Sequence, residues 1–108
     1  MVEIRQTDEY ARWFSHLRDR QARARILARL ERLEAGNFGD AKFLRDGVNE
    51  LRIDWGPGYR VYFGRDGRTV IVLLCGGDKR KQDADIKKAV ELWQEYAKRR
   101  KGEPRSKN

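Results

Sequence analysis

The chain has 108 residues and a mass of 12.8 kDa, which suits one domain with a modest core. Lysine and arginine total 25 against 17 acidic residues, giving a formal charge of +8, so a nucleic-acid partner is favoured over a basic surface that only serves solubility. The single cysteine excludes an internal disulfide, which is typical of a reducing compartment. No apolar run approaches the ~20 residues that span a bilayer, so we expect a cytoplasmic protein without membrane contact.

The first third of the chain predicts one strand and two helices. Residues 2–6 alternate apolar and polar, which is typical of a short strand, and Thr7 offers a cap for a helix over residues 8–17. A second helix is predicted over residues 20–35, ends at Gly36, and is expected to form an antiparallel hairpin with the first. The expected core positions are Val2, Ile4, Tyr10, Trp13, Phe14, Leu17, Ile26, Leu27, Leu30 and Leu33.

The middle of the chain predicts an antiparallel meander. Residues 37–47 lack periodicity and indicate a connection, held down by Phe38, Phe43 and Leu44. Three β-rich runs follow, at 48–54, 59–64 and 69–75, separated by turns at 56–58 and 66–67. The continuously apolar residues 70–74 predict a central strand that is covered on both faces.

The last third predicts a basic loop and a helix. Residues 76–81 indicate a glycine-hinged loop, and Gln82 or Asp83 is expected to cap a helix that ends near Arg100. Its expected buried stripe is Ile86, Ala89, Val90, Trp93 and Tyr96. We expect residues 1–100 to form a single domain and residues 101–108 a basic, disordered tail.

Most familiar catalytic chemistries lack support in this sequence. With one histidine and one cysteine there is no pair at metal-ligand spacing, so no cofactor or metal is expected. His16 has no nucleophile or orienting carboxylate placed near it, and Ser15 is not on a strained turn. Cys75 ends an apolar strand and is expected to be a buried, inert thiol.

A group of basic residues remains as the candidate site. The period of two predicts that Arg52 and Asp54 share one face of their strand, and that Arg60 lies on the matching face of the next strand. If the hairpin aligns these faces, the three residues form one surface patch. The basic loop Lys79-Arg80-Lys81 leaves the neighbouring strand and is in a position to close over it.

Several segments carry a resemblance to a known family. Residues 50–54, 58–63, 70–79 and 82–86, above all the Gly58-Tyr59-Arg60 step and the Cys-Gly-Gly-Asp-Lys run at 75–79, resemble the RelE/ParE toxin superfamily. The similarity is strongest to its HigB-like branch, the phage-derived addiction module killers. The resemblance implies an α+β fold of order β-α-α-β-β-β-α, with a twisted antiparallel sheet packed by an N-terminal helical hairpin and a C-terminal helix.

The resemblance also implies a function. Members of this superfamily are toxins of type II toxin–antitoxin systems, so the resemblance implies a metal-independent endoribonuclease. Such an enzyme cuts messenger RNA on the ribosome and so inhibits translation. By motif position, Arg60, Lys79 and Arg52 correspond to the cationic catalytic residues, with Arg80 and Lys81 beside them as RNA-binding residues. Asp54 stands where the family has a lysine. The implied partner is a cognate antitoxin, of the helix-turn-helix, HigA-like kind.

The chemistry of the residues leaves the proton acceptor open. Arginine stays charged, so Arg52 and Arg60 can stabilise a phosphate but cannot accept a proton. Our order of candidates for the base is Lys79, Asp54, Lys81 and Glu50. Two other functions remain open, a ParE-like toxin that poisons DNA gyrase without nuclease activity, and a basic binding module that has lost catalysis.

Overall fold

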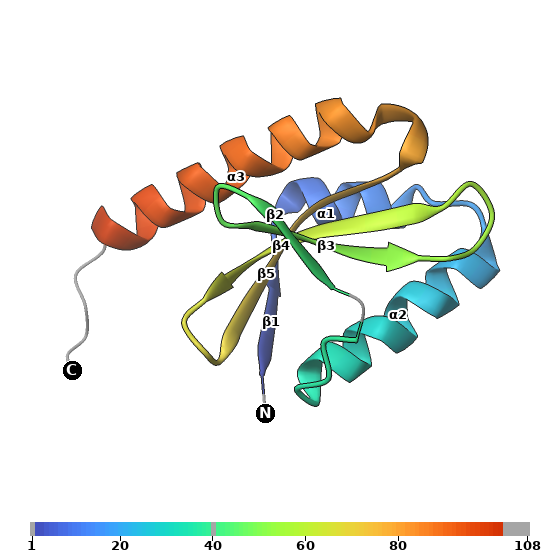
Figure 1. Ribbon diagram of the computed structural model, residues 1–108, viewed down its shortest axis with the longest axis horizontal. Helices are drawn as coiled ribbons and strands as arrows, with labels where there is room; N and C mark the ends of the chain where they lie inside the picture. The colour runs from blue at the N-terminus through green and yellow to red at the C-terminus, as the bar shows by residue number, and fades with distance from the viewer. Residues whose placement is uncertain (1, 40, 103–108) are drawn as a thin grey trace.

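A five-stranded sheet with helices on both faces forms the domain in the computed structural model, which describes residues 2–39 and 41–102 (Figure 1). The strands are β1 (Glu3–Gln6), β2 (Lys42–Arg45), β3 (Val48–Ile53), β4 (Tyr59–Asp66) and β5 (Val70–Asp78). The helices are α1 (Asp8–Ser15), α2 (Arg20–Glu34), the short 3-10 helix η1 (Lys79–Lys81) and α3 (Gln82–Gly102). The predicted α+β class is therefore confirmed.

The order of strands across the sheet is β1-β5-β4-β3-β2. The meander β2 to β5 is antiparallel, as expected, but β1 pairs with β5 in parallel, so the sheet is mixed rather than wholly antiparallel. The reason is that both α1 and α2 lie between β1 and the meander, and β5 returns alongside β1 in the same direction.

The segment expected to be a plain connection contains strand β2. It pairs with β3 at the edge of the sheet, which adds one strand to the predicted order. Phe38 and Leu44 are half-buried, but Phe43 is 63% exposed and does not hold the segment down. A four-residue edge strand with an outward aromatic side chain gives little periodic signal, which explains the omission.

Two hydrophobic cores lie on opposite faces of the sheet, because side chains alternate along each strand. The first is covered by α1 and α2 and contains Tyr10, Ile26, Leu33, Leu51, Ile53, Val61, Phe63, Ile71 and Leu73. The second is covered by α3 and contains Val48, Tyr62, Val72, Leu74, Cys75, Ala89 and Val90. The prediction that residues 70–74 form an interior strand covered on both faces is confirmed.

The ends of the two N-terminal helices follow their capping residues. Thr7 Oγ1 accepts a hydrogen bond from the Tyr10 amide at 3.0 Å, and Asp19 caps α2. The prediction for Leu27 was wrong, since it is 51% exposed. The buried face of α2 instead runs through Ala22 and Ile26, one residue and about 100° away.

The predicted glycine hinge is part of β5. Gly76 and Gly77 continue the strand to Asp78, and each lies under a side chain from a helix, Trp13 over Gly76 and Asp85 over Gly77. A Cβ at either position would collide with that side chain, so these glycines permit close packing rather than bending. The basic residues that follow form η1 and not a loop.

A bulge interrupts the pairing of β4 with β5. Tyr62 pairs with Cys75 and Phe63 pairs with Leu73, so Leu74 is an extra residue on β5. Leu74 and Cys75 consequently both belong to the core under α3.

The C-terminal helix begins at Gln82 and reaches Gly102, slightly beyond the predicted end. Ala89 and Val90 are buried, and the other members of the predicted stripe pack around them. The expected tail was placed from residue 101, but residues 101 and 102 are helical and residues 103–108 lie outside the described residues. Over the described ranges 2–39 and 41–102, no helix is both long and apolar enough to cross a membrane.

Candidate active site

The pairing of β3 with β4 brings the two predicted arginines together. Arg52 is the direct partner of Arg60, and both side chains leave the sheet on the face that carries α3. A pocket of about 400 Å³ lies there, which we call the cationic pocket; its lining residues are Arg52, Ile53, Asp54, Gly58, Tyr59, Arg60 and Lys79. The four residues predicted to be catalytic, Arg60, Lys79, Arg52 and Asp54, thus line one hollow.

A buried carboxylate holds the two arginines in place. Glu50 is 1% exposed, and its Oε1 accepts a hydrogen bond from Arg60 Nε at 3.2 Å. Its Oε2 accepts one from Arg52 Nε at 3.1 Å. Glu50 accepts only from the Nε atom of each arginine, so the two terminal amino groups of Arg52 take no part in its ion pair with Glu50.

Arg60 was predicted to lie in a surface patch, but the residue is largely buried. It is 9% exposed, and its Nη1 donates to the Gly58 carbonyl oxygen at 3.1 Å. Gly58 has a φ of +82°, which favours glycine, and a Cβ there would lie 3.8 Å from both Arg60 Nη1 and Lys79 Cδ. Arg60 is therefore fixed at the base of the pocket, while the exposed Arg52 and Lys79 lie nearer solvent.

The candidates for a proton acceptor are separated by this geometry. Asp54 and Lys79 are exposed and line the cationic pocket. Both oxygens of Glu50 are engaged in ion pairs beneath the arginines, and Lys81 lines a different pocket. Asp54 and Lys79 are therefore the better placed candidates of the four.

The predicted RNA-binding residues divide between two hollows. Arg80 and Lys81 line a second pocket of about 470 Å³, together with Trp13, Gly76, Gly77 and other residues from α1, β5 and α3. Tyr59 lines both this second pocket and the cationic pocket. Contrary to expectation, the basic run does not close over one patch, because η1 directs only Lys79 into the cationic pocket.

Asp78 anchors the start of η1. Its carboxylate accepts a hydrogen bond from the Arg80 amide at 2.9 Å and forms an ion pair with the Arg80 guanidinium. The Arg80 hydrogen bonds hold the pKa of Asp78 below its ordinary value. Arg80 is thus paired within its own turn, while its side chain stays exposed.

The structure identifies two contributors to the site that the sequence reasoning missed. Glu50 ranked last as a base, and its position two residues before Arg52 on one strand face was the available signal. Tyr59 was given no role in the site, although it neighbours Arg60 in the Gly58-Tyr59-Arg60 step.

Cys75 is buried, as expected. Its Sγ donates a weak hydrogen bond to the Asp85 carbonyl oxygen at 3.6 Å, and desolvation raises its pKa to about 12.

His16 lies outside both pockets, and its Nδ1 is 2.8 Å from the Arg12 carbonyl oxygen. In residues 2–39 and 41–102, no group of histidine, cysteine or acidic residues could hold a metal ion.

The Cys75 thiol is expected to be unreactive in the folded protein. At pH 8 the raised pKa leaves almost no thiolate, and burial excludes a reagent. Ellman's reagent should label less than a tenth of the protein within an hour under native conditions, and one thiol per chain in 6 M guanidinium chloride. Rapid labelling of the native protein would contradict this picture of β5.

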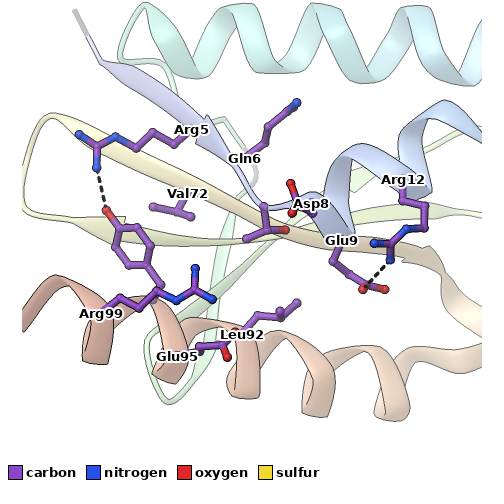
Figure 2. A pocket seen from close by; sticks show the side chains of 11 residues that line it. Arg5, Gln6, Asp8, Glu9, Arg12, Val72, Leu92, Glu95 and Arg99 are labelled. Atoms are coloured by element: carbon purple, nitrogen blue, oxygen red, sulfur yellow. Dashed lines mark hydrogen bonds and ion pairs between the residues drawn. The ribbon is translucent and has the colours of Figure 1, made fainter. Parts of the chain in front are cut away.

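A third hollow, of about 400 Å³, lies between the start of α1 and α3 (Figure 2). Its charged lining consists of Arg5, Arg12 and Arg99 against Asp8, Glu9 and Glu95. Figure 2 shows that Arg12 pairs with Glu9 and that Arg5 donates to a tyrosine hydroxyl, that of Tyr96. Since its charges balance, this hollow is a weaker candidate for a polyanion than the cationic pocket.

Three comparisons with known proteins bear on the family and the fold of the chain. The family model described as "Phage derived protein Gp49-like" matches residues 12–101. An uncharacterized protein of Haemophilus influenzae is 50% identical over 94 residues, which is 87% of this chain and 95% of that protein. Among solved structures, a free-state mutant of the Escherichia coli toxin RelE, with two arginines changed to alanine, matches with a TM-score of 0.59. That match covers 91% of this chain and 96% of the other at 17% identity, and so concerns the fold.

Proposed function

The chain belongs to the family of phage-derived Gp49-like proteins and has a RelE-like fold, and from this premise we propose that it is the toxin of a type II toxin–antitoxin pair. Its proposed activity is metal-independent cleavage of messenger RNA at the ribosome, which stops translation. The observation that carries the proposal is the grouping of Arg52, Arg60 and Lys79 around one pocket. Three cations at one hollow suit a phosphodiester and its neighbours better than an uncharged ligand.

The proposed reaction begins with the ribose 2′-hydroxyl of the substrate. Its oxygen attacks the adjacent phosphorus in line with the 5′-oxygen that leaves, giving a 2′,3′-cyclic phosphate and a 5′-hydroxyl end. Negative charge builds on the non-bridging oxygens in the transition state. Arg60, held by Glu50 and Gly58, and the more exposed Arg52 stabilise that charge, each contributing about 3 kcal/mol if well placed.

The proton transfers fall to the other two lining residues. Either the Asp54 carboxylate accepts the 2′-hydroxyl proton and Lys79 donates a proton to the 5′-oxygen, or Lys79 accepts the 2′-hydroxyl proton and water protonates the 5′-oxygen. Neither is a strong catalyst alone. An enzyme of this kind depends on a substrate that the ribosome already orients for in-line attack, because orientation supplies much of the reduction in barrier.

A cognate antitoxin completes the proposal. An acidic segment of a HigA-like, helix-turn-helix partner would complement the basic pocket and exclude RNA from it. Association would then be fast and would weaken as salt is added.

The proposed activity is tested by inducing the protein from a tightly repressed promoter. We expect growth arrest with cleaved transcripts and unchanged plasmid supercoiling, because the cationic pocket acts on RNA. The measurements are primer extension on an abundant transcript and chloroquine gels of a reporter plasmid. Arrest with intact transcripts and altered supercoiling would favour a ParE-like gyrase poison, and harmless induction a binding module without catalysis.

A further inference from the structure

We propose that the second pocket is a nucleobase subsite, which accepts the base next to the cleaved bond and prefers a base with an exocyclic amino group over uracil. The inference deepens the proposed function and rests on it. Its basis is the combination of two aromatic side chains and a carboxylate without a hydrogen bond or ion pair among the described residues in one hollow, which shares Tyr59 with the cationic pocket.

The second pocket offers flat apolar surfaces. Tyr59 and Trp13 are half-buried residues that both line it, and the Trp13 ring packs against Gly76 of β5, which also lines the pocket. Unstacked bases bind on such aromatic surfaces with about 1–3 kcal/mol each. The pocket is therefore suited in shape and chemistry to a planar ring.

Tyr59 connects the two pockets. It lines the cationic pocket on one side and the second pocket on the other. A nucleotide whose phosphate contacts Arg60 would therefore have its neighbouring base beside the Tyr59 ring. This places the base subsite next to the reacting bond rather than at a remote surface.

Asp85 supplies the polar group that distinguishes bases. Its side chain lies over Gly77 in the second pocket, and desolvation raises its pKa. In the part of the chain that the structure describes, no hydrogen bond or ion pair engages this carboxylate. The other two acids of the pocket are neutralised, since Asp78 pairs with Arg80 and Glu9 pairs with Arg12.

The preference follows from hydrogen-bond chemistry. An ionised carboxylate only accepts, so it binds the amino group of cytosine, adenine or guanine. Uracil has a carbonyl oxygen where cytosine has its amino group, and that oxygen would repel Asp85. The exposed Lys81, which also lines the pocket, is available to the phosphate of the same nucleotide.

The test is binding of mononucleotides, which are too short to be cut. The full-length protein, freed from its antitoxin or made in a cell-free system, is titrated with cytidine and uridine 5′-monophosphate. Binding is followed by the NMR signals of the Gly76 and Gly77 amides. We expect cytidine monophosphate to bind at least tenfold more tightly than uridine monophosphate.

Substitutions at Asp85 and Tyr59 distinguish the contribution of the carboxylate to nucleotide binding from that of the aromatic ring. Asp85→Asn should reduce the cytidine-to-uridine ratio to within twofold, because an amide both donates and accepts. Asp83→Asn, which removes a charge from the same first turn of α3 outside the pocket, should keep the ratio. Tyr59→Ala should weaken both nucleotides, whereas Tyr59→Phe should not.

Equal binding of the two nucleotides by the unaltered protein, or an unchanged ratio in Asp85→Asn, would overturn the inference. If transcripts are nevertheless cut on induction, the proposed function stands without the base subsite. If the cytidine preference is present but transcripts stay intact, the nuclease proposal fails and the assigned position next to a cleaved bond fails with it.

Discussion

Replacing Arg60 with alanine is expected to lower the rate of transcript cleavage by roughly 10²–10³-fold, the loss typical of removing one donor to a developing oxyanion. Growth arrest on induction should disappear as a result. The Arg60 guanidinium is held in place at the base of the cationic pocket by its hydrogen bonds to Glu50 and to the Gly58 carbonyl oxygen. The measurement is primer extension over a time course after induction, at matched protein levels.

Two further variants sharpen this result. Arg60→Lys should also impair cleavage, because a point cation cannot bond Glu50 and Gly58 together and still face a phosphate. Arg65→Ala is the matched control, since Arg65 lies on the same strand but over the Phe38 ring, away from the pocket. If Arg60→Ala and Arg65→Ala arrest growth as strongly as the unaltered protein, the nuclease assignment of Arg60 is wrong.

Replacing Glu50 with alanine is expected to destabilise the fold by about 3–5 kcal/mol, the usual cost of leaving a buried charge without its partner. Arg60 is almost fully buried, and Glu50 is its counterion. A domain of this kind has about 5–15 kcal/mol of stability in total, so the loss is a large part of it. Urea unfolding, followed by tryptophan fluorescence, measures the change in free energy of unfolding.

Asp54→Ala provides the comparison for Glu50. Asp54 lines the same pocket but is exposed, and its removal should change stability by no more than about 0.5 kcal/mol. Glu50→Gln should fall between the two, because the amide keeps an oxygen acceptor but loses the charge. A Glu50→Ala protein as stable as Asp54→Ala would mean that the buried ion pair does not hold the arginines.

Much of the fold was predictable because its signals are local. The capping residue Thr7, the apolar stripes of the helices and the alternation in the β-rich runs each reflect a preference of a few neighbouring residues. The parallel pairing of β1 with β5 was not predicted, since it joins segments separated by both N-terminal helices. Strand β2 was missed because its four residues are largely exposed.

The residues of the candidate site could be predicted from the sequence, but the burial of each side chain could not. The period of two was enough to assign Arg52 and Arg60 to matching faces, and they proved to be direct partners. Burial depends on packing from both sides of the sheet, so the sequence did not reveal that Glu50 lies beneath the arginines. Nor did it reveal that η1 separates Lys79 from Arg80 and Lys81.

The extra residue at Leu74 governs which way the end of β5 points. Beyond it, Gly76 meets Trp13 on one face and Gly77 meets Asp85 on the other. Removing one residue there would exchange these two environments and turn Lys79 away from the arginines. Deleting Leu74 is therefore expected to disturb the site more than replacing it with another apolar residue, because only the deletion changes the number of residues between the β4–β5 turn and Lys79.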